Sequence, residues 1–160
     1  MSRPQKGFSL IELLIVVAII LIIAAIAIPN LLRARMQANE ASAVSSLHSL
    51  NTAEISYASA FPTIGYSVSL SNLGDGGTSP CPGSSTASCY IDSTLAAGTK
   101  SGYLFTYVRD TSSTPSLHYT VNADPVSRGL SGQRSFYSSD ANVPRYNTSA
   151  AASSTDAPLQ

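Results

Sequence analysis

The sequence is short of charge and of the residue types on which most enzymes depend. Only 11% of the 160 residues are charged, nine basic against nine acidic, and there are two histidines and no tryptophan. Because a nucleic-acid-binding face needs an excess of basic residues, we expect no specific nucleic-acid partner. Neither His48 nor His118 is spaced near a nucleophile, and no phosphate loop, metal motif or haem motif is present. We therefore predict no enzymatic activity, no cofactor and no metal site.

What the sequence does have is one long apolar segment near its start. From Phe8 to Ile28 it contains sixteen consecutive apolar residues and only two polar ones, Ser9 and Glu12. As an α-helix this segment would be about 31 Å long, the thickness of a bilayer's hydrocarbon core. It is too long for the apolar part of a cleaved secretory signal, and no small-x-small site follows it. We interpret residues 8–30 as a transmembrane or filament-core helix.

Glu12 is the one carboxylate inside this apolar run. An unpaired charge in hydrocarbon costs several kcal/mol, so such a residue usually has a partner or a function. The spacing Ser9-x-x-Glu12 is that of a capping box, which would satisfy amides in the first helical turn. The alternative is a partner outside the segment, such as a free amino group of a neighbouring chain. Residue chemistry leaves both explanations open.

The two cysteines lie close together in a segment rich in turn-forming residues. Cys81 and Cys89 are separated by seven residues, and few apolar residues surround them. The spacing suits a small disulfide loop formed in an oxidising compartment, although two free thiols would also fit it. If the bridge forms, the domain after the helix is periplasmic or extracellular and the N-terminus is cytoplasmic. Basic residues do not orient the helix, because two lie on each side of it.

Helical spacing continues beyond the apolar run, now with a polar side. One stripe is apolar: Ala43, Leu47, Leu50, Ala53, Tyr57 and Phe61. We place Gln37, Glu40, Ser45, Ser49 and Ser56 on the opposite side. Residues 31–61 are therefore an amphipathic half of the same helix, which we expect to run from 8 to 60 and to stop before Pro62. Pro29 lies inside it and predicts a kink or a local loss of helix.

The rest of the chain predicts a small polar domain, residues 62–146. Glycines and prolines make 62–101 mostly loop. Alternating apolar and polar residues indicate strands at 102–108 and 117–123, with a third at 135–138 and a short edge piece at 143–146. Three or four antiparallel strands would pack their apolar face on the amphipathic half-helix, an α+β fold. The segment 147–160 is rich in Ser, Thr and Ala, and we expect a flexible tail.

The N-terminal residues resemble a known family. Lys6-Gly7-Phe8-Ser9-Leu10-Ile11-Glu12, the apolar helix after it and Ala27-Ile28-Pro29-Asn30 are similar to the start of type IV pilins and type II secretion pseudopilins. The shared features are a short charged leader ending in glycine, an aromatic residue after it, and a lone glutamate four residues later. The resemblance covers roughly residues 1 to 60.

The resemblance implies a processing and assembly route. Prepilin peptidase would remove the leader, residues 1–7, between Gly7 and Phe8, and the new Phe8 amino group would be N-methylated. Glu12 of one subunit would then pair with the Phe8 amino group of the next and set the register of a filament. Near Pro29 helical order would be lost on assembly. A platform membrane protein and an assembly ATPase are the implied partners.

The function expected from this resemblance is a structural subunit of an extracellular type IV pilus. Before assembly it would be anchored in the inner membrane. Two alternatives remain: a pseudopilin of a type II secretion system, and a monomeric membrane-anchored binding domain. The second would need neither the leader nor Glu12. Whether the filament serves motility, adhesion, DNA uptake, secretion or electron transfer is not visible in the residues.

Overall fold

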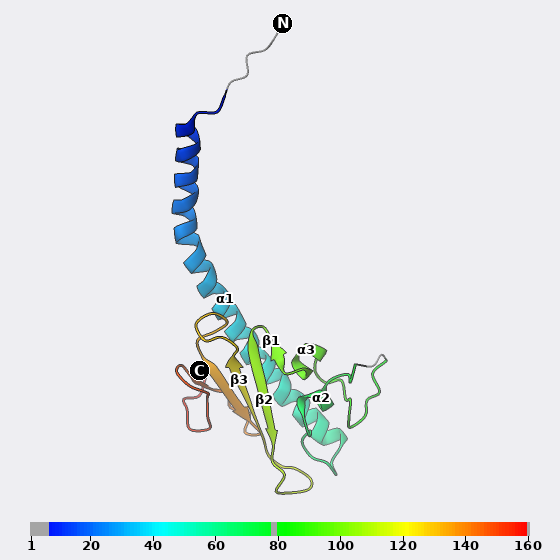
Figure 1. The fold of residues 1–160 in the computed structure, drawn as a ribbon. Helices are drawn as coiled ribbons and strands as arrows, with labels where there is room; N and C mark the ends of the chain where they lie inside the picture. Colours follow the sequence, from blue (N-terminus) through cyan, green and yellow to red (C-terminus); the bar gives the residue numbers. More distant parts are fainter. Residues whose placement is uncertain (1–6, 78–79, 160) are drawn as a thin grey trace. The chain divides into compact units, whose positions relative to one another are not determined.

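The structure is a computed structural model that describes residues 7–77 and 80–159. The expected leader, residues 1–7, therefore lies outside the described part except for Gly7. The chain divides into two units, Met1–Arg35 and Met36–Gln160, which we describe separately. Figure 1 follows the chain through both.

The first unit contains the apolar part of helix α1, which runs from Leu10 to Ala60. The helix begins two residues later than predicted and ends at the predicted residue, Ala60. Almost every side chain from Phe8 to Leu32 is exposed in the single chain. An 18-residue window of this helix has a mean hydropathy of 3.3, so by length and composition it could cross a membrane.

The second unit contains the amphipathic half of α1, and the predicted stripe is confirmed. Five of its six members are buried and Phe61 packs against the same core cluster. Gln37, Ser45 and Ser49 are exposed, as expected. The placement of Glu40 on the polar side is wrong. Its side chain lies against the domain and the residue is 7% exposed, because backbone N–H groups of a distant loop meet its carboxylate.

The sheet has five antiparallel strands in the order β1-β2-β3-β4-β5. They are β1 Thr99–Lys100, β2 Tyr103–Arg109, β3 Tyr119–Pro125, β4 Ser135–Ser139 and β5 Arg145–Asn147. The predicted strands are confirmed in approximate place as β2 to β5, but the sheet has one strand more than the three or four expected, because sequence reasoning missed β1. It is only two residues long, so it has no alternation that a pattern could reveal. Two short helices, α2 Leu70–Leu73 and α3 Ser93–Ala96, also lie in the predicted loop region.

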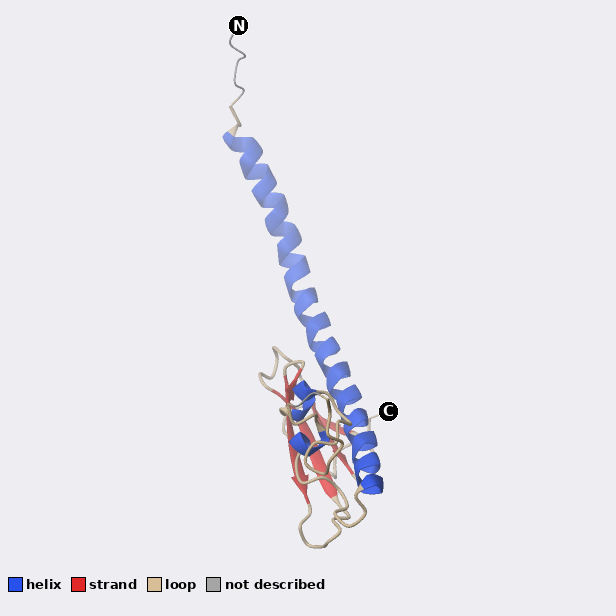
Figure 2. Cartoon of the chain, turned by 90° about the vertical axis from the view of Figure 1, so that its right-hand side faces the viewer, coloured by secondary structure: helices blue, strands red, loops and turns tan. Residues whose placement is uncertain are grey.

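The hydrophobic core lies between the amphipathic half of α1 and one face of the sheet (Figure 2). Strand alternation works as predicted on β2, where Tyr103 and Phe105 are buried while Leu104 and Val108 are exposed. The β3 residues Tyr119, Val121 and Ala123 face the same core. Leu117, expected on this face, is instead 59% exposed and precedes the strand.

The C-terminal segment packs on the sheet rather than leaving it. Ala152 is 4% exposed and Leu159 packs against the core cluster. Backbone bonds join Tyr146 to Ala157 and Leu159 to Pro144. The expected flexibility of 147–160 stays a prediction, but the segment has specific contacts.

Candidate functional site

The expected processing position lies just before α1, outside the helix. Gly7 and Phe8 are exposed and precede the helix, and Phe8 is 76% exposed. A Cβ atom built on Gly7 would meet no described atom within 4 Å. The Gly7–Phe8 peptide bond is therefore sterically open on the glycine side. A peptidase needs that access.

Glu12 caps its own helix. The Ser9 backbone N–H donates to Glu12 Oε2 at 2.9 Å, and the Leu13 N–H donates to the Ser9 carbonyl at 3.3 Å. Ser9 is thus the N-cap residue and Glu12 lies three residues later, the geometry of the glutamate half of a capping box. The predicted local explanation of Glu12 is confirmed to that extent. Among the described residues, Oε2 accepts this hydrogen bond and Oε1 accepts none. Oε1 can therefore accept a hydrogen bond from solvent or from another chain.

Pro29 lies within α1, where the helix assignment is continuous. Proline has no N–H, so the Ala25 carbonyl loses its usual donor there. At the next residue, the Asn30 side chain Nδ2 donates to the Ile26 carbonyl at 3.0 Å. This side-chain bond supplies an extra donor beside the proline. The kink expected at Pro29 stays a prediction.

Inside the second unit, Glu40 fastens the β3–β4 loop to α1. Its Oε1 accepts the backbone N–H groups of Gln133 at 2.8 Å and Arg134 at 3.1 Å, and its Oε2 accepts Arg134 Nε at 2.7 Å. Burial by itself raises the pKa of Glu40. The hydrogen bonds from Gln133 and Arg134 outweigh burial, so the pKa lies below its ordinary value.

A second buried polar contact joins α1 to β3 and β4. Asn51 is 1% exposed; its Nδ2 donates to Ser138 Oγ at 2.8 Å and to Asn142 Oδ1 at 2.6 Å. Its Oδ1 accepts the Tyr119 hydroxyl at 2.8 Å. The amide is therefore satisfied on both its oxygen and its nitrogen, which a buried polar group requires.

A third contact is made by Glu54, which is completely buried. Its carboxylate accepts the Ser67 N–H at 2.9 Å and the Ser67 hydroxyl at 2.5 Å, and Ser67 is also completely buried. Burial raises the pKa of Glu54, and the Ser67 bonds and the charge of Arg109 only partly offset that effect. This glutamate ties the segment after α1 back onto the helix.

Sequence reasoning missed these three residues as contacts, although a signal for them was present. Glu40 lies three residues before Ala43, and Glu54 lies four residues after Leu50, so both continue the apolar stripe at helical spacing. Asn51 lies beside Leu50 on the same stripe. A polar residue on an otherwise apolar stripe indicates a buried polar contact, but the sequence does not name its partner.

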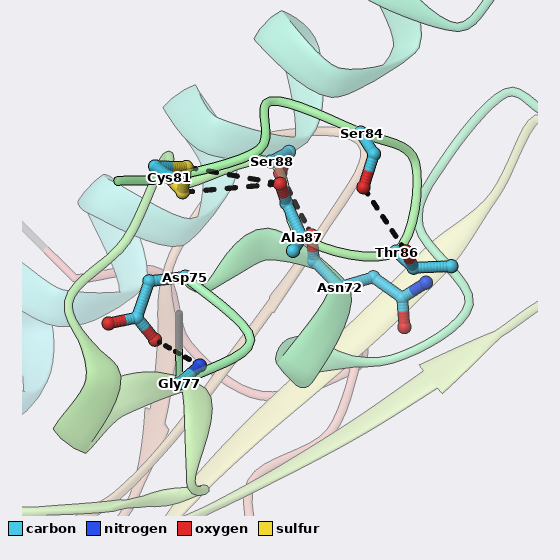
Figure 3. Close-up of a disulfide and its surroundings, with 9 residues drawn as sticks. Asn72, Asp75, Gly77, Cys81, Ser84, Thr86, Ala87 and Ser88 are labelled. Atoms are coloured by element: carbon cyan, nitrogen blue, oxygen red, sulfur yellow. Dashed lines mark hydrogen bonds between the residues drawn. A yellow bond between two sulfur atoms is a disulfide. The ribbon is translucent and has the colours of Figure 1, made fainter. Parts of the chain in front are cut away.

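The predicted disulfide is confirmed, joining Cys81 to Cys89 (Figure 3). Both sulfur atoms lie near the Ala87 carbonyl oxygen, at 3.9 and 4.0 Å. The loop rests on α2 through Ser88, whose N–H and hydroxyl both donate to the Asn72 carbonyl. Closing a loop of this length stabilises the fold by about 2.5 kcal/mol in the chain-entropy account.

Beside this loop, Asp75 begins a turn. The Gly77 N–H donates to Asp75 Oδ1 at 3.0 Å, a bond drawn in Figure 3. An Asx turn of this kind uses the carboxylate to close the backbone. This turn lies in the region 62–101 that was predicted to be mostly loop.

Comparison with known proteins finds similarity in the N-terminal region. Residues 2–28 match the family model described as the prokaryotic N-terminal methylation motif. The chain is 68% identical over 38 residues to the type IV wide pilus major component PilA4 of Thermus thermophilus, covering 24% of this chain and 29% of that protein. It is 50% identical over 53 residues to the type IV major pilin protein PilA of Myxococcus xanthus, covering 33% of this chain and 24% of that protein.

These matches span less than a third of either relative's length. No solved structure matches the chain. The match to the methylation motif includes Gly7, Phe8 and Glu12, and the long helix packed on an antiparallel sheet is a pilin-like α+β fold. The N-terminal region of the chain therefore carries the prokaryotic N-terminal methylation motif and is similar to the N-terminal region of type IV major pilins.

Proposed function

We propose that this chain is a structural subunit of an extracellular type IV pilus, cut between Gly7 and Phe8 and N-methylated at Phe8. The observation that carries the proposal is the apolar helix with a single carboxylate, Glu12, four residues after Phe8. In the described part of the first unit, the apolar side chains of this helix are exposed. Packing against identical helices in a filament would remove this surface from water.

Before assembly the subunit spans the inner membrane once. The apolar part of α1 is long enough for the hydrocarbon core. The Cys81–Cys89 bridge favours a head domain in the oxidising periplasm, and hence a cytoplasmic N-terminus. The domain boundaries that we propose are a leader at 1–7, a transmembrane or core helix at 8–30, an amphipathic half at 31–61, a head at 62–146 and a tail at 147–160.

Glu12 has two tasks in this proposal, and its two oxygens allow both. Oε2 accepts the Ser9 N–H within the chain. Oε1 is available for the Phe8 amino group of the next subunit, which is protonated at neutral pH once the leader is removed. Pairing the two charges avoids leaving either one alone in the filament core, and sets the axial register of the subunits.

The remaining parts of the proposal concern the assembly route. Prepilin peptidase removes the leader, and a platform membrane protein and an assembly ATPase add the subunit to the filament. The Pro29 region bends or loses helical order there, because one backbone bond is already missing. A pilus is favoured over a pseudopilus because both named relatives are major components of type IV pili.

The experiment that tests the proposal is N-terminal mass spectrometry of material sheared from cells. We expect an abundant peptide that starts at Phe8 and carries one added methyl group. An intact leader confined to the membrane fraction would contradict the filament function and leave an anchored monomer. A matched sample from cells without prepilin peptidase should contain only the chain with its leader.

A further inference from the structure

The loop between β3 and β4, residues 126–133, presents two branched apolar residues to solvent. Val126 is 67% exposed and Leu130 is 65% exposed. They are the two most exposed large apolar residues among the described part of Met36–Gln160. A single exposed apolar residue is ordinary on a soluble domain, but two on one short loop indicate a surface that contacts something apolar.

Hydrogen bonds within the loop fix its shape. The N–H groups of Leu130 and Ser131 both donate to the Ser127 carbonyl, at 3.1 and 2.9 Å. The Ser127 N–H donates to the Ser131 hydroxyl at 3.0 Å. The Gly129 N–H donates to the Gly132 carbonyl at 2.8 Å. Because the backbone of this turn is closed on itself, Leu130 is held at the tip of the loop and does not fold back onto the domain.

The same loop is fastened to the first turn of α1 within the second unit. Asn39 Nδ2 donates to the Ser131 carbonyl at 2.8 Å, and the Glu40 carboxylate accepts the Gln133 N–H at 2.8 Å. The second unit begins at Met36, three residues before Asn39. The loop therefore lies at the end of the head where the chain enters it from the apolar helix.

Chain length limits how far this loop can be from the membrane in the anchored subunit. Leu32 is the last exposed large apolar residue before the second unit. The four residue steps from Leu32 to Met36 span at most about 14 Å in any conformation, and Asn39 lies about 4.5 Å farther along α1. The point where the loop is attached is thus within about 20 Å of Leu32.

The opposite end of the sheet is farther along the helix. The hydroxyl of Tyr119, at the start of β3, donates to Asn51, which lies about 18 Å after Asn39 along α1. Leu117, which is 59% exposed, precedes this end of β3. The two ends of one strand therefore each have an exposed apolar residue, and only the end with Val126 lies beside the start of the unit.

The charges at the two ends also differ. Arg33 and Arg35 are exposed and immediately precede the second unit, and the loop contains no acidic residue. Asp124, two residues before the loop, is only partly exposed. Asp110 and Asp140 follow the ends of β2 and β4 at the opposite end of the sheet. A surface of anionic lipid attracts the end with the loop and repels the other end.

We propose that the loop 126–133 is a membrane-contact site. In the anchored subunit, Val126 and Leu130 enter the headgroup layer of the leaflet on the side of the head, and Arg33 and Arg35 contact the phosphates of anionic lipids there. Removal of the two apolar side chains from water favours this contact. The inference rests on the membrane-anchored state of the proposed function and adds a second contact to that of the helix.

The contact is tested with the full chain in vesicles of phosphatidylethanolamine and phosphatidylglycerol whose acyl chains carry bromine. The same fluorescent amino acid is placed at Leu130, at Leu117 or at Ile22 of the apolar helix. Bromine quenches a fluorophore only when the two are close together. We expect the label at Leu130 to be quenched at least threefold more than the label at Leu117, and the label at Ile22 to be quenched strongly.

Matched variants separate the two parts of the contact. With the label at Leu130, Val126→Asp should reduce quenching at least threefold, whereas Leu117→Asp should leave it unchanged. Both chains should keep the tyrosine circular dichroism of the unchanged chain, because both residues are exposed. Brominated phosphatidylcholine should quench the label at least twofold less than the anionic mixture. Arg33→Gln combined with Arg35→Gln should remove that difference between the two lipids.

The label at Ile22 distinguishes failure of the contact from failure of the anchored state. Strong quenching at Ile22 with equal quenching at Leu130 and Leu117 overturns the contact and leaves the membrane anchor. Absence of quenching at Ile22 overturns the anchored state and the contact with it. An emission shift of the Leu130 label that grows with the amount of protein per vesicle, without quenching, assigns the loop to a second copy and overturns the lipid partner.

Discussion

Replacement of Glu40 by alanine is the sharpest test of how the head is fastened to α1. The carboxylate accepts two backbone N–H groups, those of Gln133 and Arg134, and the Arg134 side chain. Alanine leaves both N–H groups without their acceptor in a partly buried contact. The loss of each of these two hydrogen bonds to a carboxylate costs about 1–1.5 kcal/mol.

The expected total is about 2–3 kcal/mol of lost stability. The Arg134 side chain adds little to this figure, because it is 39% exposed and stays hydrated when its partner is removed. For a unit of about 125 residues, Met36–Gln160, 1 kcal/mol lowers Tm by about 4 °C. Glu40→Ala should therefore melt about 8–12 °C below the unchanged chain at pH 7.

The assay is thermal unfolding of the full chain in detergent, followed by near-ultraviolet circular dichroism. All eight tyrosines lie in Met36–Gln160, so the tyrosine signal reports this second unit and not the apolar part of the helix. Gln37→Ala is the control. Gln37 is exposed and lies three residues before Glu40 in the same helix, so its replacement should change Tm by less than 2 °C. A Tm for Glu40→Ala within that same margin would refute the reasoning that this contact fastens the loop.

The pH dependence of the same contact has a definite sign. The folded-state pKa of Glu40 lies below its ordinary value of 4.5, because the Gln133 and Arg134 bonds outweigh burial. Its contribution is therefore present above pH 4.5 and is lost as the pH falls through the folded pKa. The difference in Tm between the unchanged chain and Glu40→Ala should shrink on acidification. A constant difference from pH 7 to pH 3 would contradict this.

Substitutions at three further residues have clear expected outcomes. Glu12→Ala should abolish filaments in sheared fractions; Glu12→Gln can still accept the Ser9 N–H, so filaments from it at normal yield would reduce Glu12 to a helix cap. Burial raises the pKa of Glu54, so its stabilising contribution is full below pH 4.5 and is lost as the pH rises through the folded pKa; Glu54→Gln should therefore gain Tm relative to the unchanged chain between pH 4 and 8, and a parallel pH profile would contradict this. Gly132→Ala should cost about 1–3 kcal/mol, since its Cβ would lie 2.0 Å from the hydroxyl oxygen of the buried Tyr103; an unchanged Tm would show that the ring moves freely.

Much of the fold follows from local pattern, and its exceptions share a cause. The helix end at Ala60, the buried stripe through Leu47 and Leu50, and the alternation on β2 depend on residue spacing within one element. The misplaced residues depend on distant chain. Glu40 is drawn inward by a loop more than ninety positions away, and β1 exists only because β2 offers it an edge.

The sequence by itself determined the apolar helix, its lone Glu12, the match of the N-terminal residues to the methylation motif and the cysteine pair, because each depends on residues close together in the chain. Only the tertiary structure decided which polar residues of α1 are buried and what they contact, and that the Ser- and Ala-rich C-terminus lies on the sheet. The physical reason is that small and polar residues carry little burial signal of their own. Their place depends on hydrogen-bond donors such as Arg128 and Asn122, which only folding brings to them.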